Sequence, residues 1–335
     1  MSVKVAINGF GRIGRVFFRA VANDPNIEVV AINDLGDSAN LAYLLEFDSV
    51  YRRAAFKVSI DGDMLMVNGK QIPISHEPDL TKLPWKQHDV DVVVESTGVF
   101  TDPAKARGHI EAGAKRVVIS APAKGEGAET ILMGVNEDKF STCDITSNAS
   151  CTTNAASPLI GILKEAIGIE RAVLSTVHGY TASQAIVDAP NKKDFREGRA
   201  AAVNIVPSST GAAIATTLAH TELAGKFDGI SLRVPVPAGS IVDVTFVASR
   251  ATTAEEVNTA LKDAAASDRW KGVFAVSEQP LVSSDILGQP YGSIADLALT
   301  RVVDGTLVKV LAWYDNEMGY ASTLVQHVLA AGNAK

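Results

Sequence analysis

The sequence has only two cysteines, Cys143 and Cys151, among 335 residues, which excludes a fold held together by disulfides. No apolar run approaches the roughly 20 residues that span a bilayer, so we expect no membrane association. There is no basic tail or stripe, and the formal net charge of −7 argues against dedicated nucleic-acid binding. A strand pattern starts at Val3 with no signal peptide ahead of it, so we expect a cytoplasmic protein whose thiols stay reduced.

The length suits two domains, each with its own core. Residues 1–150 alternate short apolar runs with helical periodicity, which predicts a doubly wound parallel sheet of the Rossmann type. The expected strands are Val3–Ile7, Glu28–Asn33, Val90–Glu95 and Arg116–Ser120. The expected helices are Arg12–Ala22, Ser38–Glu46 and Pro103–Ala112, and Met64–Ile74 is expected to form an inserted hairpin.

From residue 151 the pattern predicts an α+β domain with a mostly antiparallel sheet, because its strands are longer and Val242–Ala248 alternates between apolar and polar residues. The expected strands are Arg171–His178, Gly229–Val236, Val242–Ala248, Leu297–Val303 and Leu307–Tyr314. The expected helices are Thr152–Ala166, Gly211–Ala219, Ala254–Ala265 and Gly319–Ala331. We therefore expect domains at residues 1–150 and 151–316, with a C-terminal helix in residues 317–335 that packs back on the first domain.

Cys151 lies among small polar residues where a helical pattern starts near Thr152. The N–H groups at a helix start have no partner within the helix and carry a partial positive charge, which favours a thiolate. A small residue that merely caps a helix would leave the same pattern. His178, at the end of an expected strand, could form an ion pair with Cys151, lower its pKa and move a proton, although a histidine at a strand end is often structural. No spacing of cysteine or histidine fits a metal site.

A glycine motif, G-x-G-x-x-G over Gly9, Gly11 and Gly14, directly follows the first expected strand and opens a helix. Glycines there let the backbone approach a pyrophosphate at the helix N-terminus. Asp34 ends the second strand 20 residues after Gly14, where a carboxylate binds the adenine ribose and repels a 2′-phosphate. The motif therefore predicts NAD in preference to NADP.

Two further features point to anions. Ser208-Ser209-Thr210-Gly211 places hydroxyls and a glycine at a helix start. Arg233 interrupts an otherwise apolar strand, and a guanidinium in such a strand needs an anionic partner, either a carboxylate of the protein or a bound phosphate.

Together these residues resemble the phosphorylating glyceraldehyde-3-phosphate dehydrogenases over essentially the entire chain, from the block Lys4–Arg15 to the block Trp313–Glu317, with Ala149–Asn154 as the most specific block. The resemblance implies that Cys151 is the nucleophile and that His178 is its activator and acid–base group. It implies that the substrate's C3 phosphate is bound by Thr181 and Arg233. It implies that inorganic phosphate is bound by Ser150, Thr152, Thr210 and Gly211. The NAD-contacting positions that it implies are Gly9, Gly11, Arg12, Ile13, Asp34, Ser120 and Asn316, the last of which would orient the nicotinamide amide.

The resemblance also implies the reaction: oxidation of glyceraldehyde 3-phosphate through a thioester on Cys151, reduction of NAD, and attack by phosphate to give 1,3-bisphosphoglycerate, in a homotetramer. Three other readings remain open from the residues. They are a sister enzyme acting on erythrose 4-phosphate, a thiol hydrolase using Cys151 and His178, and a non-catalytic dinucleotide sensor.

The chain departs from the family pattern at several positions. Ala155, Gly179 and Met318 replace common residues, and we expect effects on packing only. Glu197 stands where many bacterial members carry a phosphate-binding arginine, and Ala189 replaces a frequent leucine near the adenosine. These two changes leave the details of the phosphate site, and some use of NADP, open.

Overall fold

The computed structural model describes residues 2–192 and 194–334. The chain divides into two compact units. The first unit runs from the N-terminus to Ala149 and includes the C-terminal residues from Ala321 onward, and the second is Ser150–Tyr320. Within the described ranges, no helix has the length and apolar character needed to cross a bilayer.

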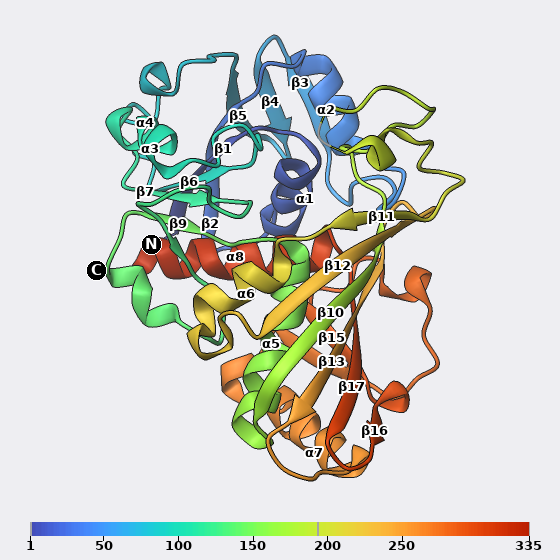
Figure 1. The fold of residues 1–335 in the computed structure, drawn as a ribbon. Coiled ribbons are helices and arrows are strands. Elements are labelled where there is room, and N and C mark those ends of the chain that lie inside the picture. The colour runs from blue at the N-terminus through green and yellow to red at the C-terminus, as the bar shows by residue number, and fades with distance from the viewer. Residues whose placement is uncertain (1, 193, 335) are drawn as a thin grey trace. The chain divides into compact units, whose positions relative to one another are not determined.

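The first unit contains a nine-stranded sheet in the order β3-β4-β5-β2-β1-β6-β7-β9-β8 (Figure 1). Its strands are β1 (Val3–Asn8), β2 (Ile27–Asn33), β3 (Val58–Asp61), β4 (Met64–Val67), β5 (Lys70–Ser75), β6 (Val92–Glu95), β7 (Arg116–Ile119), β8 (Glu129–Thr130) and β9 (Ile145–Ser147). Strand β1 pairs in parallel with β2 on one side and β6 on the other, so the order reverses direction at β1. This confirms the predicted doubly wound sheet. The antiparallel pair β4–β5 is the predicted inserted hairpin, and β3 adds a further antiparallel strand that the pattern did not indicate.

The helices of the first unit are α1 (Arg12–Val21), α2 (Ser38–Glu46), α3 (Pro103–Ala106) and α4 (Gly108–Glu111). The prediction of one helix over Pro103–Ala112 is wrong, because the chain is divided at Arg107. Gly108 follows that break, and a Cβ there would lie 2.9 Å from the Leu80 side chain. Gly108 therefore combines low helix propensity with a close packing contact.

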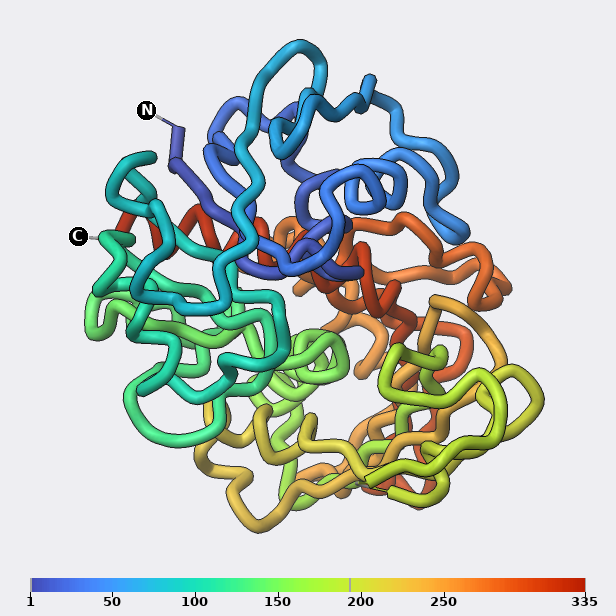
Figure 2. The backbone as a smooth tube through the Cα atoms, turned by 90° about the horizontal axis from the view of Figure 1, so that it is seen from above, coloured from blue at the N-terminus to red at the C-terminus, as the bar shows by residue number. Residues whose placement is uncertain are grey.

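The second unit contains an eight-stranded sheet in which β11-β12-β10-β13-β17-β15-β14 form the path and β16 pairs with β17. Its strands are β10 (Ile169–Gly179), β11 (Val206–Ser209), β12 (Phe227–Val234), β13 (Ser240–Ala248), β14 (Phe274–Ser277), β15 (Ser293–Asp296), β16 (Arg301–Val303) and β17 (Leu307–Tyr314). Only β10–β12 and β14–β15 pair in parallel, which confirms a mostly antiparallel sheet. The connection between β10 and β11, yellow-green in Figure 2, contains one short 3-10 turn, Phe195–Gly198.

The prediction of a strand over Leu297–Val303 is wrong in its first half. The side chain of Asp296 accepts a hydrogen bond from the N–H of Ala298 at 3.2 Å and starts a 3-10 turn over Leu297–Leu299. Only Arg301–Val303 pairs as a strand. The neighbouring strands β14 and β15 were not expected, because β15 is buried at all its positions and so shows no alternation.

Helices cover one face of the second sheet. These are α5 (Cys151–Ala166), α6 (Ala212–Ala219) and α7 (Ala254–Ala265) (Figure 1). Helix α5 contacts β10, β13, β15 and β17, while α6 contacts β12 and α7 contacts β14. On the other face, apolar side chains are exposed, with Val173 59% and Ile230 54% accessible.

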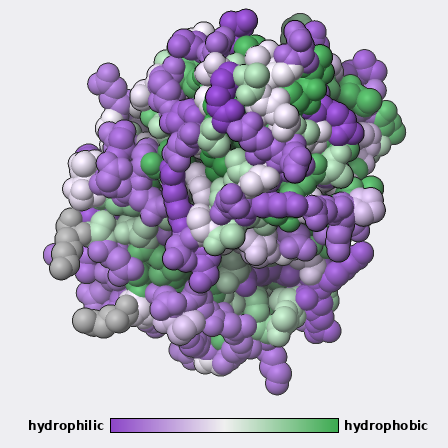
Figure 3. All heavy atoms as spheres, turned by 90° about the horizontal axis from the view of Figure 1, so that it is seen from below, coloured by the Kyte–Doolittle hydropathy of each residue, from purple (hydrophilic) through white to green (hydrophobic). Residues whose placement is uncertain are grey.

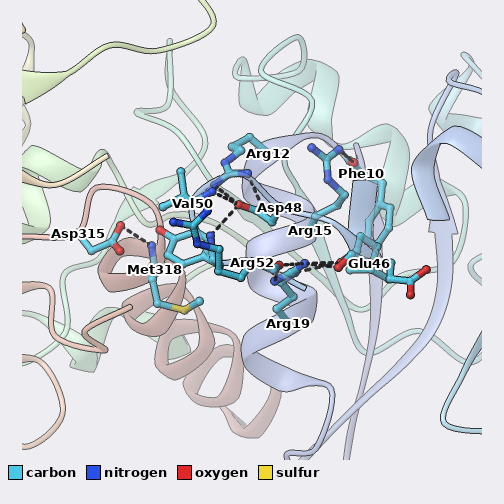
Figure 4. Close-up of polar contacts among 12 residues, drawn as sticks. Phe10, Arg12, Arg15, Arg19, Glu46, Asp48, Val50, Arg52, Asp315 and Met318 are labelled. Carbon is cyan, nitrogen blue, oxygen red and sulfur yellow. Dashed lines mark hydrogen bonds and ion pairs between the residues drawn. The ribbon is translucent and has the colours of Figure 1, made fainter. Parts of the chain in front are cut away.

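The last helix, α8 (Met318–Asn333), was expected over Gly319–Ala331. Its first residue donates its N–H to Asp315 Oδ1 at 3.0 Å (Figure 4). From Ala321 onward it belongs to the first unit, where Leu324 and Val328 are fully buried. His327 lies there too, with Nε2 2.7 Å from Thr146 Oγ1 and its ring edge-on to Phe140.

We predict that His327 makes the protein sensitive to acid. Burial lowers the pKa of His327 from 6.5 to about 3. As the pH falls through the range between these values, the unfolded chain binds this proton and the folded chain does not. The free energy of unfolding should therefore fall with pH, by about 2 kcal/mol for this residue between about pH 7 and pH 5. We expect the free energy of unfolding of His327→Gln, measured by urea unfolding at both pH values, to decrease between these pH values by about 2 kcal/mol less than that of the wild type.

Phe140→Leu is the control, because it trims the ring packed on His327 and removes no titrating group. It should lower stability at both pH values and keep the wild-type pH dependence. An unchanged pH dependence in His327→Gln would contradict the prediction.

Candidate active site

Cys151 is the first residue of α5, one position earlier than the sequence pattern indicated. The preceding Ser150 is the N-cap, and its Oγ accepts a hydrogen bond from the N–H of Thr153 at 3.1 Å. Ala149 before it is buried and has a φ of 52°, a backbone conformation that costs energy for a residue other than glycine. The chain therefore turns sharply into α5, and the Cys151 side chain lies at the positive end of the helix.

His178 lies near the C-terminal end of β10, and its side chain meets the thiol. Its Nε2 is 3.3 Å from Cys151 Sγ, and its Nδ1 is 2.6 Å from the carbonyl oxygen of Gly179. The imidazole is 3% exposed and lies edge-on to the Tyr314 ring at 5.9 Å. These contacts fix the ring orientation, so Nε2 is the nitrogen available for proton exchange with sulfur.

Arg233 is the third member of this cluster. Strands β10 and β12 are parallel neighbours in a register that places Arg233 beside His178, and Arg233 NH1 lies 2.6 Å from His178 Nδ1. Among the described residues, no carboxylate pairs with Arg233, and its buried Nε has no hydrogen-bond partner. Of the two kinds of partner expected for this guanidinium, a protein carboxylate and a bound phosphate, the described part of the chain does not supply the first.

Burial controls the charges of the pair. It lowers the pKa of His178 to about 4, and the neighbouring Arg233 cation is the second cause. It also raises the pKa of the Cys151 thiol, against the opposing effect of Arg233. The direction for the thiol is opposite to the lowering expected from the helix start and His178, because burial is the largest contribution. A proton transfer from Sγ to Nε2 would create two charges that neutralise each other, so the buried pair favours thiolate formation together with proton transfer.

Three buried hydroxyl groups form a hydrogen-bonded chain next to Cys151 and His178. Tyr314 OH lies 2.9 Å from Thr152 Oγ1 and 2.7 Å from Thr176 Oγ1. Burial raises the pKa of Tyr314, so the phenol stays protonated and remains a hydrogen-bond donor. The sequence patterns did not assign a role to Tyr314 or Thr176, because both occupy ordinary inward positions of strands. Thr152, an expected phosphate ligand, is itself buried in this chain of hydroxyls.

The other expected anion-binding residues lie on two segments. Gly211 is the N-cap of α6 without a side-chain cap, and a Cβ there would meet nothing within 4 Å. Thr210 Oγ1 accepts the N–H of Ala212 at 3.1 Å. Thr181 contacts Ser183, with 3.0 Å between the two hydroxyl oxygens. Cys151, His178 and Arg233 are thus in direct contact, whereas Thr181, Thr210 and Gly211 are not in hydrogen-bond contact with them.

Glu197 has a structural partner. Ser208 Oγ donates to Glu197 Oε1 at 2.8 Å, which joins the 3-10 turn Phe195–Gly198 to β11. Arg199 pairs with Asp188, with 3.1 Å between Nε and Oδ2. Glu197 therefore has a structural role here, whereas Arg199 uses only Nε in its ion pair and keeps further N–H donors.

In the first unit the three motif glycines differ in their surroundings. Gly9 has a φ of 92°, and a Cβ there would lie 2.6 Å from the backbone N of Thr97. A Cβ on Gly14 would lie 2.2 Å from the Gly9 carbonyl oxygen. Gly11 is the N-cap of α1, has no side-chain cap, and faces open space. The first N–H groups of α1 are therefore accessible to an anion, as a bound pyrophosphate requires.

A cavity of about 430 Å³ lies beside this helix start. Gly9, Gly11 and Asp34 line it, together with Asn8, Asn33 and Thr97. The Asp34 carboxylate is fixed by the N–H groups of Phe10 at 2.6 Å and Gly36 at 2.8 Å. Each carboxylate oxygen keeps a further lone pair for a ribose hydroxyl.

The other four expected NAD-contacting residues, Arg12, Ile13, Ser120 and Asn316, do not line this cavity. Arg12 directs its guanidinium to Asp48 (Figure 4), with 3.1 Å between NH2 and Oδ1. Ser120 directly follows β7, and its N–H donates to the Glu95 carbonyl. In the second unit, Asn316 Oδ1 accepts from the Gly239 N–H at 3.1 Å and from Ser240 Oγ at 3.0 Å. These two bonds fix the orientation of its amide, so its NH₂ group is the donor left for a ligand.

A buried polar network lies under the dinucleotide cavity. Trp85 Nε1 donates to His109 Nδ1 at 2.9 Å, so the His109 proton is on Nε2, which donates to Glu95 Oε2 at 2.9 Å. Glu95 also accepts from Asn8 Nδ2 at 2.6 Å and from the Thr97 N–H at 2.9 Å. This carboxylate holds together two segments that line the cavity. Sequence periodicity could not reveal it, because its members come from four separate segments.

The chain matches two family models. Residues 3–103 match the model described as the NAD binding domain of glyceraldehyde 3-phosphate dehydrogenase, and residues 150–316 match its C-terminal domain. Among curated relatives, glyceraldehyde-3-phosphate dehydrogenase 1 of Bacillus subtilis (strain 168) is 52% identical over 337 residues, covering 100% of this chain and 99% of the relative. The glyceraldehyde-3-phosphate dehydrogenase of Priestia megaterium is 50% identical, covering 99% of this chain and 100% of the relative. That of Geobacillus stearothermophilus is 52% identical, covering 97% of each.

We predict that alanine at Gly14 mainly lowers stability, whereas alanine at Gly11 mainly weakens NAD binding. Gly14→Ala should destabilise the fold by about 2–3 kcal/mol, because its Cβ meets the Gly9 carbonyl oxygen. Gly11→Ala should cost less than about 1 kcal/mol of stability, yet weaken NAD binding at least about tenfold, because the methyl group occupies the space that the pyrophosphate needs. Urea unfolding and calorimetric titration with NAD separate the two effects. Wild-type NAD affinity in Gly11→Ala would contradict the assignment of this helix start.

Proposed function

The chain belongs to the glyceraldehyde-3-phosphate dehydrogenase family, and on that premise we propose that its second unit oxidises the aldehyde through a thioester on Cys151, with His178 as the acid–base group. The reaction is the NAD-dependent oxidation of glyceraldehyde 3-phosphate with phosphate to 1,3-bisphosphoglycerate. The names of the curated relatives favour this substrate over erythrose 4-phosphate. The observation that carries the assignment of roles is the 3.3 Å contact between Cys151 Sγ and His178 Nε2 at the start of α5.

In the first half of the reaction, Sγ attacks the aldehyde carbon while Nε2 of His178 takes the thiol proton. The developing oxyanion is stabilised by backbone N–H at the start of α5 and then takes the thiol proton back from His178 Nε2, which gives the hydroxyl of a hemithioacetal and leaves Nε2 free again as a base. His178 then removes the hydroxyl proton as the carbon is oxidised to the thioester. Bound NAD supplies one function, acceptance of the hydride.

In the second half, an oxygen of inorganic phosphate attacks the thioester carbonyl, and the Cys151 thiolate leaves. The N-terminus of α6, with Thr210 and the uncapped Gly211, is suited to hold this phosphate. We assign Ser150 and Thr152 to the same site. The Thr152 hydroxyl can make a second hydrogen bond beside the one it shares with Tyr314. Thr181 and Arg233 are assigned to the C3 phosphate of the substrate.

NAD fits the first unit. Gly9 and Gly11 leave room for the pyrophosphate, and Arg12 and Ile13 are assigned to it through their backbone N–H groups, since the Arg12 side chain pairs with Asp48. Asp34 is assigned to the adenine ribose, and its negative charge disfavours the 2′-phosphate of NADP. Ser120 and Asn316 complete the proposed set. We accordingly treat residues 1–150 as the NAD-binding domain, 151–316 as the catalytic domain and 317–335 as a helix returning to the first.

We further propose that the enzyme is a cytoplasmic homotetramer. The two cysteines are unpaired, which suits a reducing compartment. The uncovered face of the second sheet exposes Val173 and Ile230, and the β10–β11 connection exposes Ile186, which is 83% accessible. Figure 3 shows hydrophobic patches between the polar side chains on one face of the molecule. Exposed apolar groups on a sheet face favour association with further copies of the chain.

Cys151→Ser should abolish turnover and preserve the cofactor site. We expect kcat with glyceraldehyde 3-phosphate, phosphate and NAD to fall at least about 10³-fold, with NAD affinity in calorimetry unchanged within about twofold. Turnover at the wild-type rate would refute the proposed nucleophile. In the wild type, oxidation of erythrose 4-phosphate that is faster and independent of phosphate would refute the assigned substrate.

Val173→Glu should break the assembly, because it places a charge on the apolar sheet face. Light scattering should give four times the 35.2 kDa chain mass for the wild type and a smaller multiple for the variant. Val303→Glu, at a similarly exposed valine on the edge strand β16, is the control and should keep the wild-type mass. A monomeric wild type would contradict the proposal.

A further inference from the structure

His178 Nδ1 has two incompatible neighbours. The Gly179 carbonyl oxygen and Arg233 NH1 each lie 2.6 Å from it. A carbonyl oxygen requires a proton on Nδ1, whereas a guanidinium N–H requires a bare lone pair there. One nitrogen of a neutral imidazole satisfies only one of these contacts at a time.

The carbonyl cannot give way, because its peptide is held at both ends of Gly179. The Gly179 N–H donates to Ser240 Oγ at 3.2 Å, and the N–H of Tyr180, in the same peptide group as the carbonyl, donates to Val236 O at 3.1 Å. The imidazole ring is held by Cys151 and Tyr314. Arg233 is the remaining member, with a long side chain, no carboxylate partner among the described residues and an unpartnered Nε. An anion can therefore move Arg233 more easily than any other part of the cluster.

The position of Arg233 decides which nitrogen carries the proton. With Arg233 at Nδ1, the proton of the neutral ring is on Nε2, which faces Sγ and then accepts neither the thiol proton nor the hemithioacetal proton. With Arg233 withdrawn, Nδ1–H donates to the Gly179 carbonyl, and the Nε2 lone pair faces the reacting atoms. The change releases one proton from Nε2 and binds one at Nδ1, so the charge of the ring does not change.

We propose that the phosphate group of the substrate draws Arg233 away from His178 and thereby converts His178 into the tautomer that acts as a base. Arg233 is then a specificity-determining residue as well as a phosphate ligand. With aldehydes that lack a phosphate, Arg233 stays beside His178 and lowers the rate constant of hydride transfer. This inference rests on the proposed function, in which Arg233 binds the C3 phosphate.

The test separates the anion from the aldehyde. Single-turnover formation of NADH is followed with saturating glyceraldehyde, which lacks the phosphate, with and without phosphite dianion. Because a positioned general base contributes roughly 10²–10⁴-fold, we expect phosphite to raise the rate constant at least about tenfold in the wild type. Formation of NADH precedes attack on the thioester, so reaction of phosphite with the thioester does not enter the measurement.

Arg233→Met keeps an apolar stem and removes the donor that occupies Nδ1. We expect this variant to oxidise glyceraldehyde faster than the wild type does without phosphite, and to show no response to phosphite. Rates are compared per thiolate, read from its ultraviolet absorbance, because Arg233 also affects the thiol. Arg233→Ala carries the same expectation if the Met variant does not fold.

Thr181→Ala is the matched variant, since Thr181 is assigned to the same phosphate but its hydroxyl contacts Ser183 rather than His178. It should need more phosphite for half-maximal activation and reach the wild-type maximum. An Arg233→Met variant as slow as the unactivated wild type, or a Thr181→Ala variant that loses activation entirely, would overturn the proposal, since both follow if the anion only improves binding. Wild-type turnover of glyceraldehyde 3-phosphate, measured in parallel, distinguishes failure of this inference from failure of the proposed function.

Discussion

The contact between Cys151 Sγ and His178 Nε2 is the interaction on which the second unit depends. Burial opposes a charge on either group, yet the reaction needs a thiolate and an imidazolium for a moment. The surrounding elements each lower that cost in a different way. Helix α5 starts at the sulfur, so its N–H groups face the developing charge. The imidazole is carried by strand β10, which lies between β12 and β13 in the sheet, so the backbone of His178 is held on both sides and its ring has little freedom to turn.

Two kinds of helix start among the described residues matter for ligand binding. Asp37, Ser150 and Thr253 cap α2, α5 and α7 with their own side chains. Helices α1 and α6 begin instead at glycines, Gly11 and Gly211, which cap with no side chain and have no atom near the position of a Cβ, and at α6 only the N–H of Ala212 is bound, by Thr210 Oγ1. A capped helix start has satisfied part of its N–H groups internally, whereas an uncapped and open one keeps them for a ligand. The two open starts are those assigned to the NAD pyrophosphate and to inorganic phosphate.

Local sequence patterns predicted what depends on neighbours in the chain. Periodicity gave most strands and helices, and the spacing of Gly9, Gly11 and Asp34 gave one wall of the dinucleotide cavity. The helix over Pro103–Ala112 and the strand over Leu297–Val303 failed where a single contact, Gly108 with Leu80 or Asp296 with Ala298, interrupted the pattern. Features that arise from contacts between separate elements could not be predicted. The meeting of His178 with Arg233, the hydroxyl chain through Tyr314, and the Glu95–His109 pair each join residues that are distant in the sequence.

The net charge explains why one arginine carries so much of the specificity. A chain with a formal charge of −7 repels anions at long range. The phosphate groups of its ligands must therefore be bound by short-range contacts. Arginines elsewhere in the described chain, such as Arg107 and Arg250, pair with carboxylates and are neutralised. Arg233 is half-buried without such a partner, and a carboxylate beside it would compete with the substrate. Leaving it unpaired costs stability, but it lets the arriving phosphate provide the missing partner. The same movement that satisfies Arg233 then frees Nδ1 of His178, so binding and activation become one event.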